Sequence, residues 1–417
     1  MELTTKQGFK QTEIGLIPED WEVVAFDKIG YFLKGKGIKK DEVVSNGNPC
    51  IRYGELYTKY DNIIKKTFSF ISNEIASTSL KLKYGDLLFA GSGEKREEIG
   101  KSAVILRSDT YAGGDIVVFR GRNIEVSYLG YISNSSPVIK QKSLYGQGDA
   151  VVHIYSGGLS KIKFPLPPTL KEQKAIATAL SDVDDLIASL EDLIAKKQAI
   201  KQGAMQQLLI PKEHWVKTCL VELAENKKSR FDDGDWIESE HIISQGVRLI
   251  QTGNIGIGSF LDKGNKKYIS EESFNQLNCK EVLTGDLLVC RLAEPAGRAC
   301  IMPNIGEQKV ITSVDVSIFR GNESLVSREF LSQIFTTKSW FNKVLEKVGG
   351  TTHKRISRGA LGKIEIELPQ KKEQDKTAKI LSDMDGELEQ LETKKAKYQQ
   401  LKQGMLQELL TGNTRLV

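Results

Sequence analysis

Residues 168–209, PTLKEQKAIATALSDVDDLIASLEDLIAKKQAIKQGAMQQLL, occur a second time as residues 369–410, PQKKEQDKTAKILSDMDGELEQLETKKAKYQQLKQGMLQELL. The copies lie 201 residues apart, so that Glu172 recurs as Glu373 and Lys201 as Lys402. A repeat of this kind marks one structural unit carried twice. The sequence therefore predicts a chain of two similar halves.

The repeated stretch has the periodicity of a helix that packs against another helix. Apolar residues step by four and three along its first copy: Ile176, Leu180, Val183, Ile187, Leu190 and Ile194. Such a heptad seam requires a partner helix. Thr169 and Glu172 form a T-x-x-E capping box at its start, and Lys197 and Lys201 interrupt the seam. A helix over residues 171–209 would be ~58 Å long at 1.5 Å per residue.

The two long helices are expected to pair antiparallel, because the ~150 residues between them fold too compactly to return the chain along ~58 Å. Each is preceded by short apolar runs broken by Gly, Asn and Asp, which indicate strands and loops. The prediction is an α+β protein with two similar loop-rich domains and an antiparallel coiled coil related by a pseudo-two-fold axis. The expected divisions are residues 1–166 for the first domain with its N-terminal arm, 167–210 for the first helix, 211–367 for the second domain, 368–412 for the second helix and 413–417 for a tail.

Framework positions recur between the domains, whereas their loops differ. Gly85-Asp86-Leu87-Leu88 matches Gly285-Asp286-Leu287-Leu288, and Phe119-Arg120-Gly121 matches Phe319-Arg320-Gly321. By contrast, KGKGIKKDEVV has no counterpart in ENKKSRFDDGDW, nor has FAGSGEKREEIG in VCRLAEPAGR. One scaffold with two loop sets indicates two binding specificities.

Composition excludes several classes of protein. The chain has 417 residues, a net charge of +5, and five cysteines without a CxxC pair, which argues against a disulfide framework or a zinc site. No stretch approaches the ~18 apolar residues of a membrane span, so we expect a cytoplasmic protein. Gly93 to Ser102 ends in Gly-Lys-Ser, but Lys95 stands where a phosphate-binding loop needs glycine. No catalytic, cofactor or metal motif is present.

The candidate functional residues are cations, amides and aromatics in the variable loops, because Lys and Arg neutralise phosphates while Arg, Asn and Gln bond purine edges. In the first domain they are Lys34, Lys36, Lys39, Lys40, Arg52, Tyr53, Ser92, Lys95, Arg96, Lys142, Tyr145 and Gln147. In the second they are Lys227, Lys228, Arg230, Gln251, Thr252, Asn254, Arg291, Lys354 and Arg355. A solvated surface role remains the alternative for each of them.

The whole pattern, with the opening FKQTEIGLIPEDWE over residues 9–22 and the helix entry ELPQKKEQ over residues 367–374, resembles the specificity subunits of type I restriction-modification systems. The resemblance implies two target recognition domains that each read one half of a bipartite, asymmetric site in double-stranded DNA. It implies that the coiled coil sets the spacing, with half-sites about one DNA turn apart, and docks two methyltransferase subunits, which restriction and translocation subunits join. It assigns AdoMet, ATP and Mg²⁺ to those partners and no catalysis to this chain. A coiled-coil scaffold with protein-binding ends is the alternative.

Overall fold

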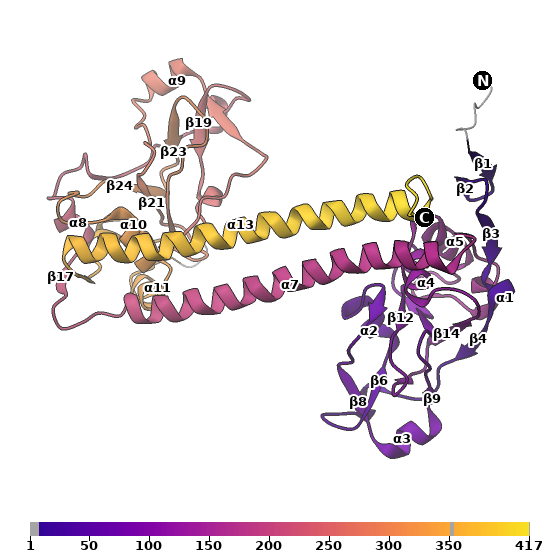
Figure 1. Cartoon of the computed structure of the whole chain (residues 1–417). Helices are drawn as coiled ribbons and strands as arrows, with labels where there is room; N and C mark the ends of the chain where they lie inside the picture. Colours follow the sequence, from indigo (N-terminus) through magenta and orange to yellow (C-terminus); the bar gives the residue numbers. More distant parts are fainter. Residues whose placement is uncertain (1–7, 351–353, 417) are drawn as a thin grey trace. The chain divides into compact units, whose positions relative to one another are not determined.

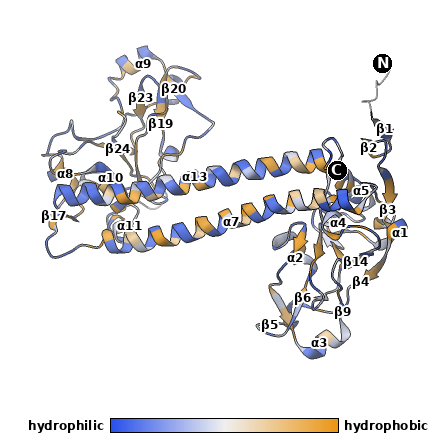
Figure 2. Ribbon diagram, viewed as in Figure 1, coloured by the Kyte–Doolittle hydropathy of each residue, from blue (hydrophilic) through white to orange (hydrophobic). Residues whose placement is uncertain are grey.

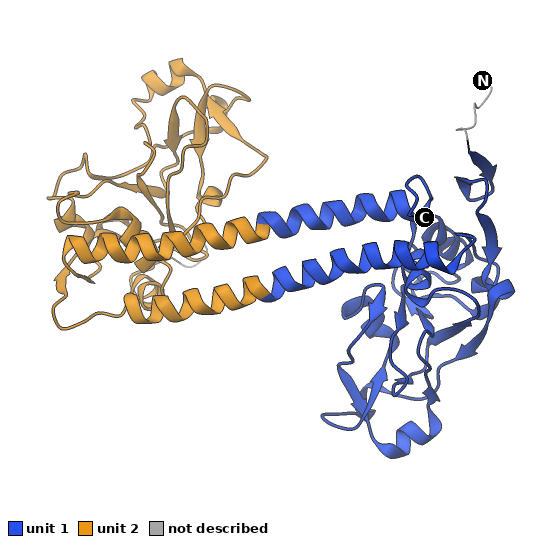
Figure 3. Ribbon diagram, viewed as in Figure 1, with its two compact units in different colours: residues 1–192, 393–417 blue, residues 193–392 orange. Residues whose placement is uncertain are grey.

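The computed structural model describes residues 8–350 and 354–416. The chain forms two compact units, of which unit 1 comprises residues 1–192 and 393–417 and unit 2 comprises residues 193–392 (Figure 3). Each unit contains one globular domain and one half of each long helix. The long helices are α7 (Leu170–Leu208), with the expected 39 residues, and α13 (Lys371–Leu410), with 40. The α+β class with two domains and two long helices is confirmed.

The domain of unit 1 is built on two five-stranded sheets (Figure 1). The first sheet has the order β4 (Gly30–Lys34), β14 (Ile116–Gly121), β10 (Leu87–Ala90), β12 (Ser102–Ile105) and β7 (Ile63–Ile64). The second has the order β5 (Val43–Val44), β8 (Ser69–Ile71), β6 (Asn48–Ile51), β13 (Tyr111–Ala112) and β9 (Leu80–Lys81). The central strands β10 and β12 are buried along their whole length, as a four-residue apolar run between turns predicts.

Short helices and strand pairs complete unit 1. The helices are α1 (Phe26–Ile29), α2 (Tyr53–Thr58), α3 (Asn73–Thr78), α4 (Val126–Ile132), α5 (Ser136–Tyr145) and α6 (Ser156–Leu159), with the 3-10 turn η1 (Lys40–Glu42). The strand pairs are β1 (Phe9–Thr12) with β2 (Gly15–Pro18), β3 (Glu22–Ala25) with β16 (Lys163–Leu166), and β11 (Ser92–Gly93) with β15 (Val152–His153). The β3–β16 pair therefore joins the two ends of the domain just before α7 begins.

Unit 2 repeats this plan with smaller sheets. Its first sheet has the order β18 (Phe231–Asp233), β24 (Val316–Phe319), β21 (Leu287–Cys290) and β22 (Ala299–Ile301), and its second the order β20 (Lys267–Ile269), β19 (Val247–Ile250) and β23 (Val310–Thr312). The pair β17 (Val216–Thr218) and β25 (Ile366–Leu368) corresponds to β3 and β16. The helices are α8 (Leu220–Leu223), α9 (Glu271–Gln276), α10 (Arg328–Ile334), α11 (Lys338–Leu345) and α12 (Arg358–Gly362), with the 3-10 turns η2 (Ser239–His241) and η3 (Thr252–Asn254).

The recurring G-D-L-L and F-R-G sequences form one framework contact in each unit. In unit 1 the Arg120 guanidinium donates two hydrogen bonds of 2.7 Å to the buried Asp86 carboxylate. In unit 2 Arg320 donates to Asp286 at 2.9 and 2.8 Å. The carboxylate beside it raises the pKa of each arginine further. Each bidentate pair joins the ends of two adjacent strands, β10 and β14 in unit 1 or β21 and β24 in unit 2. This contact explains why both sequences recur.

The repeated E-Q sequence connects each long helix to its domain. Gln173 accepts from the amide of Glu125 at 2.9 Å and donates to the Pro167 carbonyl at 3.0 Å. Gln374 likewise accepts from the Ser327 amide at 2.9 Å and donates to the Pro369 carbonyl at 2.8 Å. Both glutamine side chains are buried. The glutamine thus ties the start of the long helix to the start of α4 or α10.

The helix starts differ from the predicted capping box. The Thr169 hydroxyl accepts from the Glu172 amide at 3.2 Å, as expected. The Glu172 carboxylate, however, bonds the guanidinium of Arg415 in the C-terminal tail rather than the backbone. In the second copy Gln370 replaces the threonine, and its backbone carbonyl accepts from the Glu373 amide at 2.9 Å. The second helix therefore begins without a side-chain cap.

The lysines that interrupt the apolar seam form ion pairs across it. In unit 1 Lys402 lies 2.5 Å from the Asp184 carboxylate, and in unit 2 the equivalent Lys201 pairs with Asp385. Lys197 lies 2.6 Å from Glu387. Residues later in α7 thus pair with residues earlier in α13, so the helices run antiparallel within unit 2, as predicted. The apolar seam is therefore interrupted at these lysines, and charged contacts take the place of apolar ones.

Each half of the coil is joined to a hydrophobic core. In unit 1 Ile176, Leu180, Leu409 and Leu410 are buried in the same cluster as the core residues of the first sheet. In unit 2 Leu209, Ala378 and Leu381 are likewise buried in the same cluster as the core residues of that unit's first sheet. Figure 2 shows apolar and polar residues alternating along both long helices. Each globular domain is thereby packed on its helices through apolar side chains.

Candidate nucleic-acid interface

One short segment in unit 1 holds three variable loops through backbone hydrogen bonds. This junction segment comprises residues 112–116. Gly35 donates to the carbonyl of Ile116 at 2.8 Å, and Gly91 to that of Asp115 at 2.6 Å. Gly114 donates to the carbonyl of Gly37 at 2.7 Å, and Gly113 to that of residue 51 at 2.9 Å. The loops that follow β4, β6 and β10 therefore meet at one place.

Unit 2 repeats the arrangement around its own junction segment, residues 312–316. Gly234 donates to the carbonyl of Val316 at 2.9 Å, and Arg291 to that of Asp315 at 2.8 Å. Ser313 donates to the carbonyl of Ile250 at 3.0 Å. These three bonds repeat those of Gly35, Gly91 and Gly113 in unit 1, whereas the side chains of the loops differ. This is the structural form of one scaffold with two loop sets.

The first of these loops is a short capped turn after β6 or β19. The Arg52 amide donates to the Glu55 carboxylate at 2.9 Å, and the Gln251 amide donates to the Asn254 side-chain oxygen at 3.0 Å. Tyr53 is 41% exposed, whereas Asn254 is buried and also donates to the Leu261 carbonyl at 2.8 Å. Asn254 is therefore structural, which corrects its assignment as a binding residue.

The first positions of the two turns are occupied by Arg52 with Tyr53 and by Gln251 with Thr252. Arg52, Gln251 and Thr252 are half-buried. The Arg52 Nε–H is buried without a hydrogen-bond partner in residues 8–350 and 354–416. An unpaired buried donor costs ~1–3 kcal/mol, so an external acceptor that draws this side chain out would relieve that cost.

The second loop follows β4 or β18 and has the same path but opposite charge in the two units. Lys34 pairs with Val117 in the sheet register and Asp233 with Ser317, and both loops reach a 3-10 turn six residues later. The lysine loop, residues 34–40, carries four exposed lysines: Lys34, Lys36, Lys39 and Lys40. The acidic loop, residues 233–240, carries Asp233, Asp235 and Glu238 over the equivalent seven residues, and then Glu240, which corresponds to Asp41 of unit 1. KGKGIKKDEVV thus has a structural counterpart, which begins at Asp233.

The third loop bounds a hollow of about 240 Å³ in unit 1, between β4, β11 and β15. Its lining includes Lys34, the exposed Asp115 and the exposed Tyr155. The predicted residue Ser92 is buried there, with its hydroxyl 2.9 Å from His153 Nδ1. Ser92 and Lys34 are therefore brought together, but Ser92 is engaged by the histidine.

In unit 2 the Arg291 side chain lies where glycine stands in unit 1, since Gly91 and Arg291 make the same backbone bonds. The buried Arg291 guanidinium donates to the carbonyls of Ile356 and Val314 and lies 2.9 Å from the Asp233 carboxylate. Desolvation on burial lowers its pKa. Arg291 is therefore a structural cation, and its assignment to DNA contact is wrong.

Lys142 is the other predicted cation that the fold buries. Its ammonium donates to the Gly100 carbonyl at 2.7 Å and the Ser102 hydroxyl at 3.0 Å, and it lies 5.2 Å from the Phe89 ring centroid. Burial lowers its pKa well below the usual value for lysine. A side chain enclosed in this way cannot reach a ligand, so this prediction is also wrong.

The remaining predicted residues of unit 1 lie beside the hollow or beyond it. Arg96 donates to the carbonyls of Gly146 and Gly148 at 2.8 and 3.0 Å, so it holds two loops together. Lys95 is exposed and lies 3.6 Å from Glu98. Tyr145 is 36% exposed, and the backbone of Gln147 bonds that of His153 in both directions. Gln147 is therefore joined to the hollow, whereas Lys95 is paired locally.

The cations of unit 2 fall into two groups. Lys227 and Arg230 pair with Glu225 at 2.6 and 2.9 Å, and Lys228 lies 3.9 Å from Asp232. All three precede β18, at the opposite end of that strand from the acidic loop. Arg355 lies 2.9 Å from Asp315 of the junction segment, and the carbonyl of the exposed Lys354 accepts from Ala293. Only Lys354 and Arg355 therefore lie with the interface.

Sequence reasoning missed the acidic and aromatic members of these clusters, together with one lysine. They are Asp115, His153 and Tyr155 in unit 1, and Asp233, Asp235, Lys280 and Asp315 in unit 2. Asp115 and Asp315 recur 200 residues apart between the two domains, and this recurrence was the available signal. The acidic loop gave no signal, because its acids stand where unit 1 has lysines.

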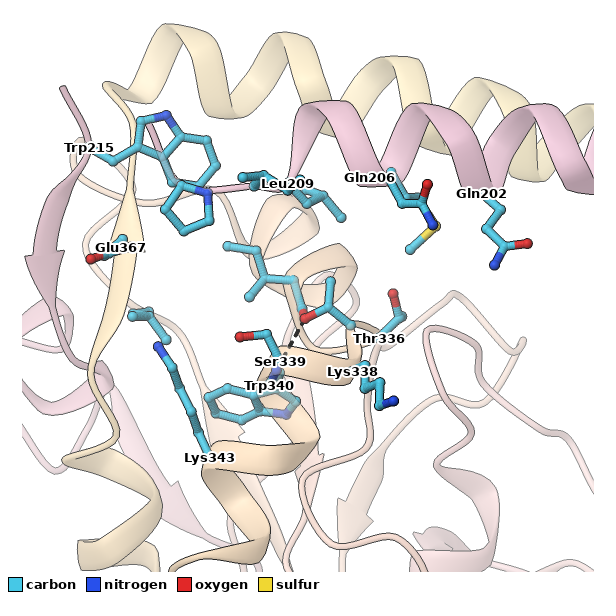
Figure 4. A pocket seen from close by; sticks show the side chains of 16 residues that line it. Gln202, Gln206, Leu209, Trp215, Thr336, Lys338, Ser339, Trp340, Lys343 and Glu367 are labelled. Carbon is cyan, nitrogen blue, oxygen red and sulfur yellow. Dashed lines mark hydrogen bonds between the residues drawn. The ribbon is translucent and has the colours of Figure 1, made fainter. Parts of the chain in front are cut away.

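A separate apolar groove of about 520 Å³ lies in unit 2, under the last turns of α7 (Figure 4). Leu209, Trp215 and Trp340 line it, and Trp340 stacks on Phe335 with ring centroids 3.8 Å apart. Unit 1 has a matching groove of about 530 Å³ under the last turns of α13, with Leu16 of the β1–β2 hairpin in one wall. Neither groove includes residues of a junction segment.

Two further features are absent from the described residues. No helix there is long and apolar enough to cross a bilayer. Within residues 8–350 and 354–416, no group of three or more His, Cys, Asp and Glu side chains could hold a metal ion.

Comparison with known proteins gives one family and full-length relatives. The model of the type I restriction modification DNA specificity domain matches twice, at residues 18–202 and 213–403. The MjaVIII type I restriction enzyme specificity subunit of Methanocaldococcus jannaschii is 26% identical, over 100% of this chain and 98% of its own length. The MjaX specificity subunit of the same organism, named as putative, is 28% identical over 99% and 97%.

Two solved structures share the fold. The S subunit of the type I restriction-modification system from M. genitalium gives a TM-score of 0.62 at 14% identity and covers 94% of this chain and 96% of its own. A chain from a study of complex assembly and conformational transition of the type I R-M system gives 0.52 at 16%, covering 95% and 99%.

Proposed function

Because this chain belongs to the family of the type I restriction modification DNA specificity domain, we propose that it reads a bipartite DNA site, with one half-site for each unit. It is a specificity component and not a catalytic subunit. The observation that carries the proposal is the pair of junction segments, which hold loops of different chemistry on one backbone framework. A framework of this kind presents different base-contacting groups at equivalent positions.

The proposal divides the interface into two tasks. Exposed lysines of the lysine loop, with Lys354 in unit 2, contact phosphates and position the duplex. Arg52 and Tyr53 in unit 1, and Gln251 and Thr252 in unit 2, face base edges. Arginine makes paired hydrogen bonds to guanine and glutamine to adenine in the major groove, so the two turns are suited to different bases.

The long helices set the distance between the half-sites in this proposal and dock two methyltransferase subunits. Ile200 and Leu401 support it, because they occupy equivalent positions of the repeat and are 48% and 49% exposed. Large apolar residues that stay exposed at equivalent positions of both long helices favour a protein partner. AdoMet, ATP and Mg²⁺ serve the methyltransferase and restriction subunits, which supply the chemistry.

Selection of duplexes from a random-sequence library by the chain assembled with its methyltransferase tests the proposal. We expect enrichment of two short, unlike motifs at a fixed separation. Even recovery of all sequences would refute it. Ile200→Asp with Leu401→Asp should abolish co-purification of the methyltransferase while the circular dichroism spectrum is retained, and Lys196→Asp is the exposed control on the same helix.

A further inference from the structure

The lysine loop and the acidic loop follow one path, so their opposite charges call for a physical explanation. In unit 2 two acids of the loop, Asp233 and Asp235, are balanced by cations inside the unit. Asp233 lies 2.9 Å from Arg291, and Asp235 accepts from the Lys280 amide at 2.7 Å and lies 3.6 Å from its ammonium. Asp232 also pairs with Lys280 and Arg358. Asp233 and Asp235 of the acidic loop are thus neutralised without a ligand.

In unit 1 the two positions that correspond to Arg291 and Lys280 carry no acid. Gly91 is equivalent to Arg291, because both amides donate to the junction-segment aspartate. Leu80 is equivalent to Lys280, because the amides two residues further on, at positions 82 and 282, donate to the carbonyls of residues 110 and 310. The lysine loop therefore differs from the acidic loop in its own charge and in the residues that face it. None of its four lysines is in an ion pair in the part of the chain that the structure describes.

From this contrast we propose that the lysine loop is a phosphate clamp and that the acidic loop contacts no phosphate, so that the two units grip DNA unequally. The inference rests on the proposed function. Four ammonium groups within seven residues repel one another, and phosphates of a duplex would neutralise them with release of counterions. Carboxylates in the acidic loop would repel the same phosphates.

The clamp lies next to the turn that holds Arg52. Gly37 of the lysine loop and residue 51 both bond the junction segment, at adjacent glycines. A loop that fixes the backbone of the duplex would therefore fix the register of bases presented to Arg52 and Tyr53. In unit 2 Gln251 has no such neighbour, so its half-site should depend more on base contacts and less on salt.

The expected size follows from counterion release. Each phosphate contact contributes about 0.9 to the slope of log affinity against log salt. Lys36→Gln with Lys39→Gln should lower that slope by about 1.8 and weaken binding about 30-fold at 0.15 M salt, as extrapolated from 1 M. The control, Lys140→Gln with Lys161→Gln, removes the same charge from two exposed lysines elsewhere in unit 1 and should change neither quantity.

The experiment measures affinity for the selected duplex between 0.05 and 0.5 M salt, with the chain assembled with its methyltransferase. Glu238→Gln with Glu240→Gln in the acidic loop should leave the slope unchanged. An unchanged slope in the Lys36/Lys39 variant, an equal fall in the control, or a changed base preference without a changed slope would each overturn the clamp. Failure of the wild-type complex to select any site would instead refute the proposed function, so the two failures are distinguishable.

Discussion

Replacing Lys402 with methionine tests whether the seam lysines stabilise the coil. Lys402 lies 2.5 Å from Asp184, whose other carboxylate oxygen accepts from the Tyr131 hydroxyl at 2.7 Å. Methionine retains an apolar stem of similar length but removes the charge. We expect Lys402→Met to lower the free energy of unfolding, because Asp184 would be left part-buried with only a neutral partner.

The magnitude follows from the exposure of the pair. Two unit charges 2.5 Å apart attract by roughly 7 kcal/mol at an effective dielectric constant of 20, and desolvation offsets most of this. Exposed pairs contribute ~0–1 kcal/mol, and breaking a buried pair costs ~3–5 kcal/mol. Lys402 and Asp184 are 14% and 29% exposed, so we expect a loss of about 2 kcal/mol. The equivalent Lys201–Asp385 pair, at 21% and 43%, should lose about 1 kcal/mol.

Urea titration followed by circular dichroism measures the loss, and hydrogen exchange of amides in α13 localises it. A double-mutant cycle with Asp184→Asn should give a coupling energy of about 1–2 kcal/mol. Lys379→Met is the matched control, since its pair with Asp383 is 76% and 66% exposed. Equal effects of Lys402→Met, Lys201→Met and Lys379→Met would refute the argument, as would unchanged stability of the first.

Three further changes test the side chains that the fold assigns. Arg291→Ala should destabilise unit 2 by about 3 kcal/mol, because it leaves the Asp233 carboxylate without its guanidinium, and Asp233→Ala in addition should recover part of the loss in urea titration. Lys142 has a lowered pKa in the folded chain and about 10.4 when unfolded, so the unfolded state holds more protons between those values. The free energy of unfolding should therefore rise more steeply from pH 7 to 10 than in Lys142→Met, and equal slopes would contradict the burial argument. Arg52→Gln should shift one position of the first half-site from guanine toward adenine by ~1–3 kcal/mol in methylation mapping, and a change in the second half-site would contradict the assignment.

The large-scale organisation was predictable because it depends on repeated residues. Glu172, Gln173, Asp184 and Lys201 recur at a constant offset, and the contacts of Gln173 and Lys201 recur with them. The heptad seam likewise depends only on the order of apolar residues. Local spacing therefore contained enough information for the long helices and the number of domains, and the length of chain between the helices gave their direction.

The candidate site was only partly predictable, because burial and pairing depend on residues far away in sequence. Lys142 is enclosed by Gly100 and Ser102, and Arg291 is held by Asp233 and Ile356. Nothing near Lys142 or Arg291 in sequence separates these cations from the exposed lysines of residues 34–40. The equivalence of the lysine and acidic loops also required strand register, since their residues differ at nearly every position.

The most direct test of the central claim replaces residues 211–368 with a second copy of residues 18–166. The variant is assembled with its partners, and methylated positions are mapped across a genome. If each unit reads its own half-site, the variant should methylate sites that contain two copies of the first half-site and none of the second. Retention of the original asymmetric site by a folded, methylating variant would contradict the account.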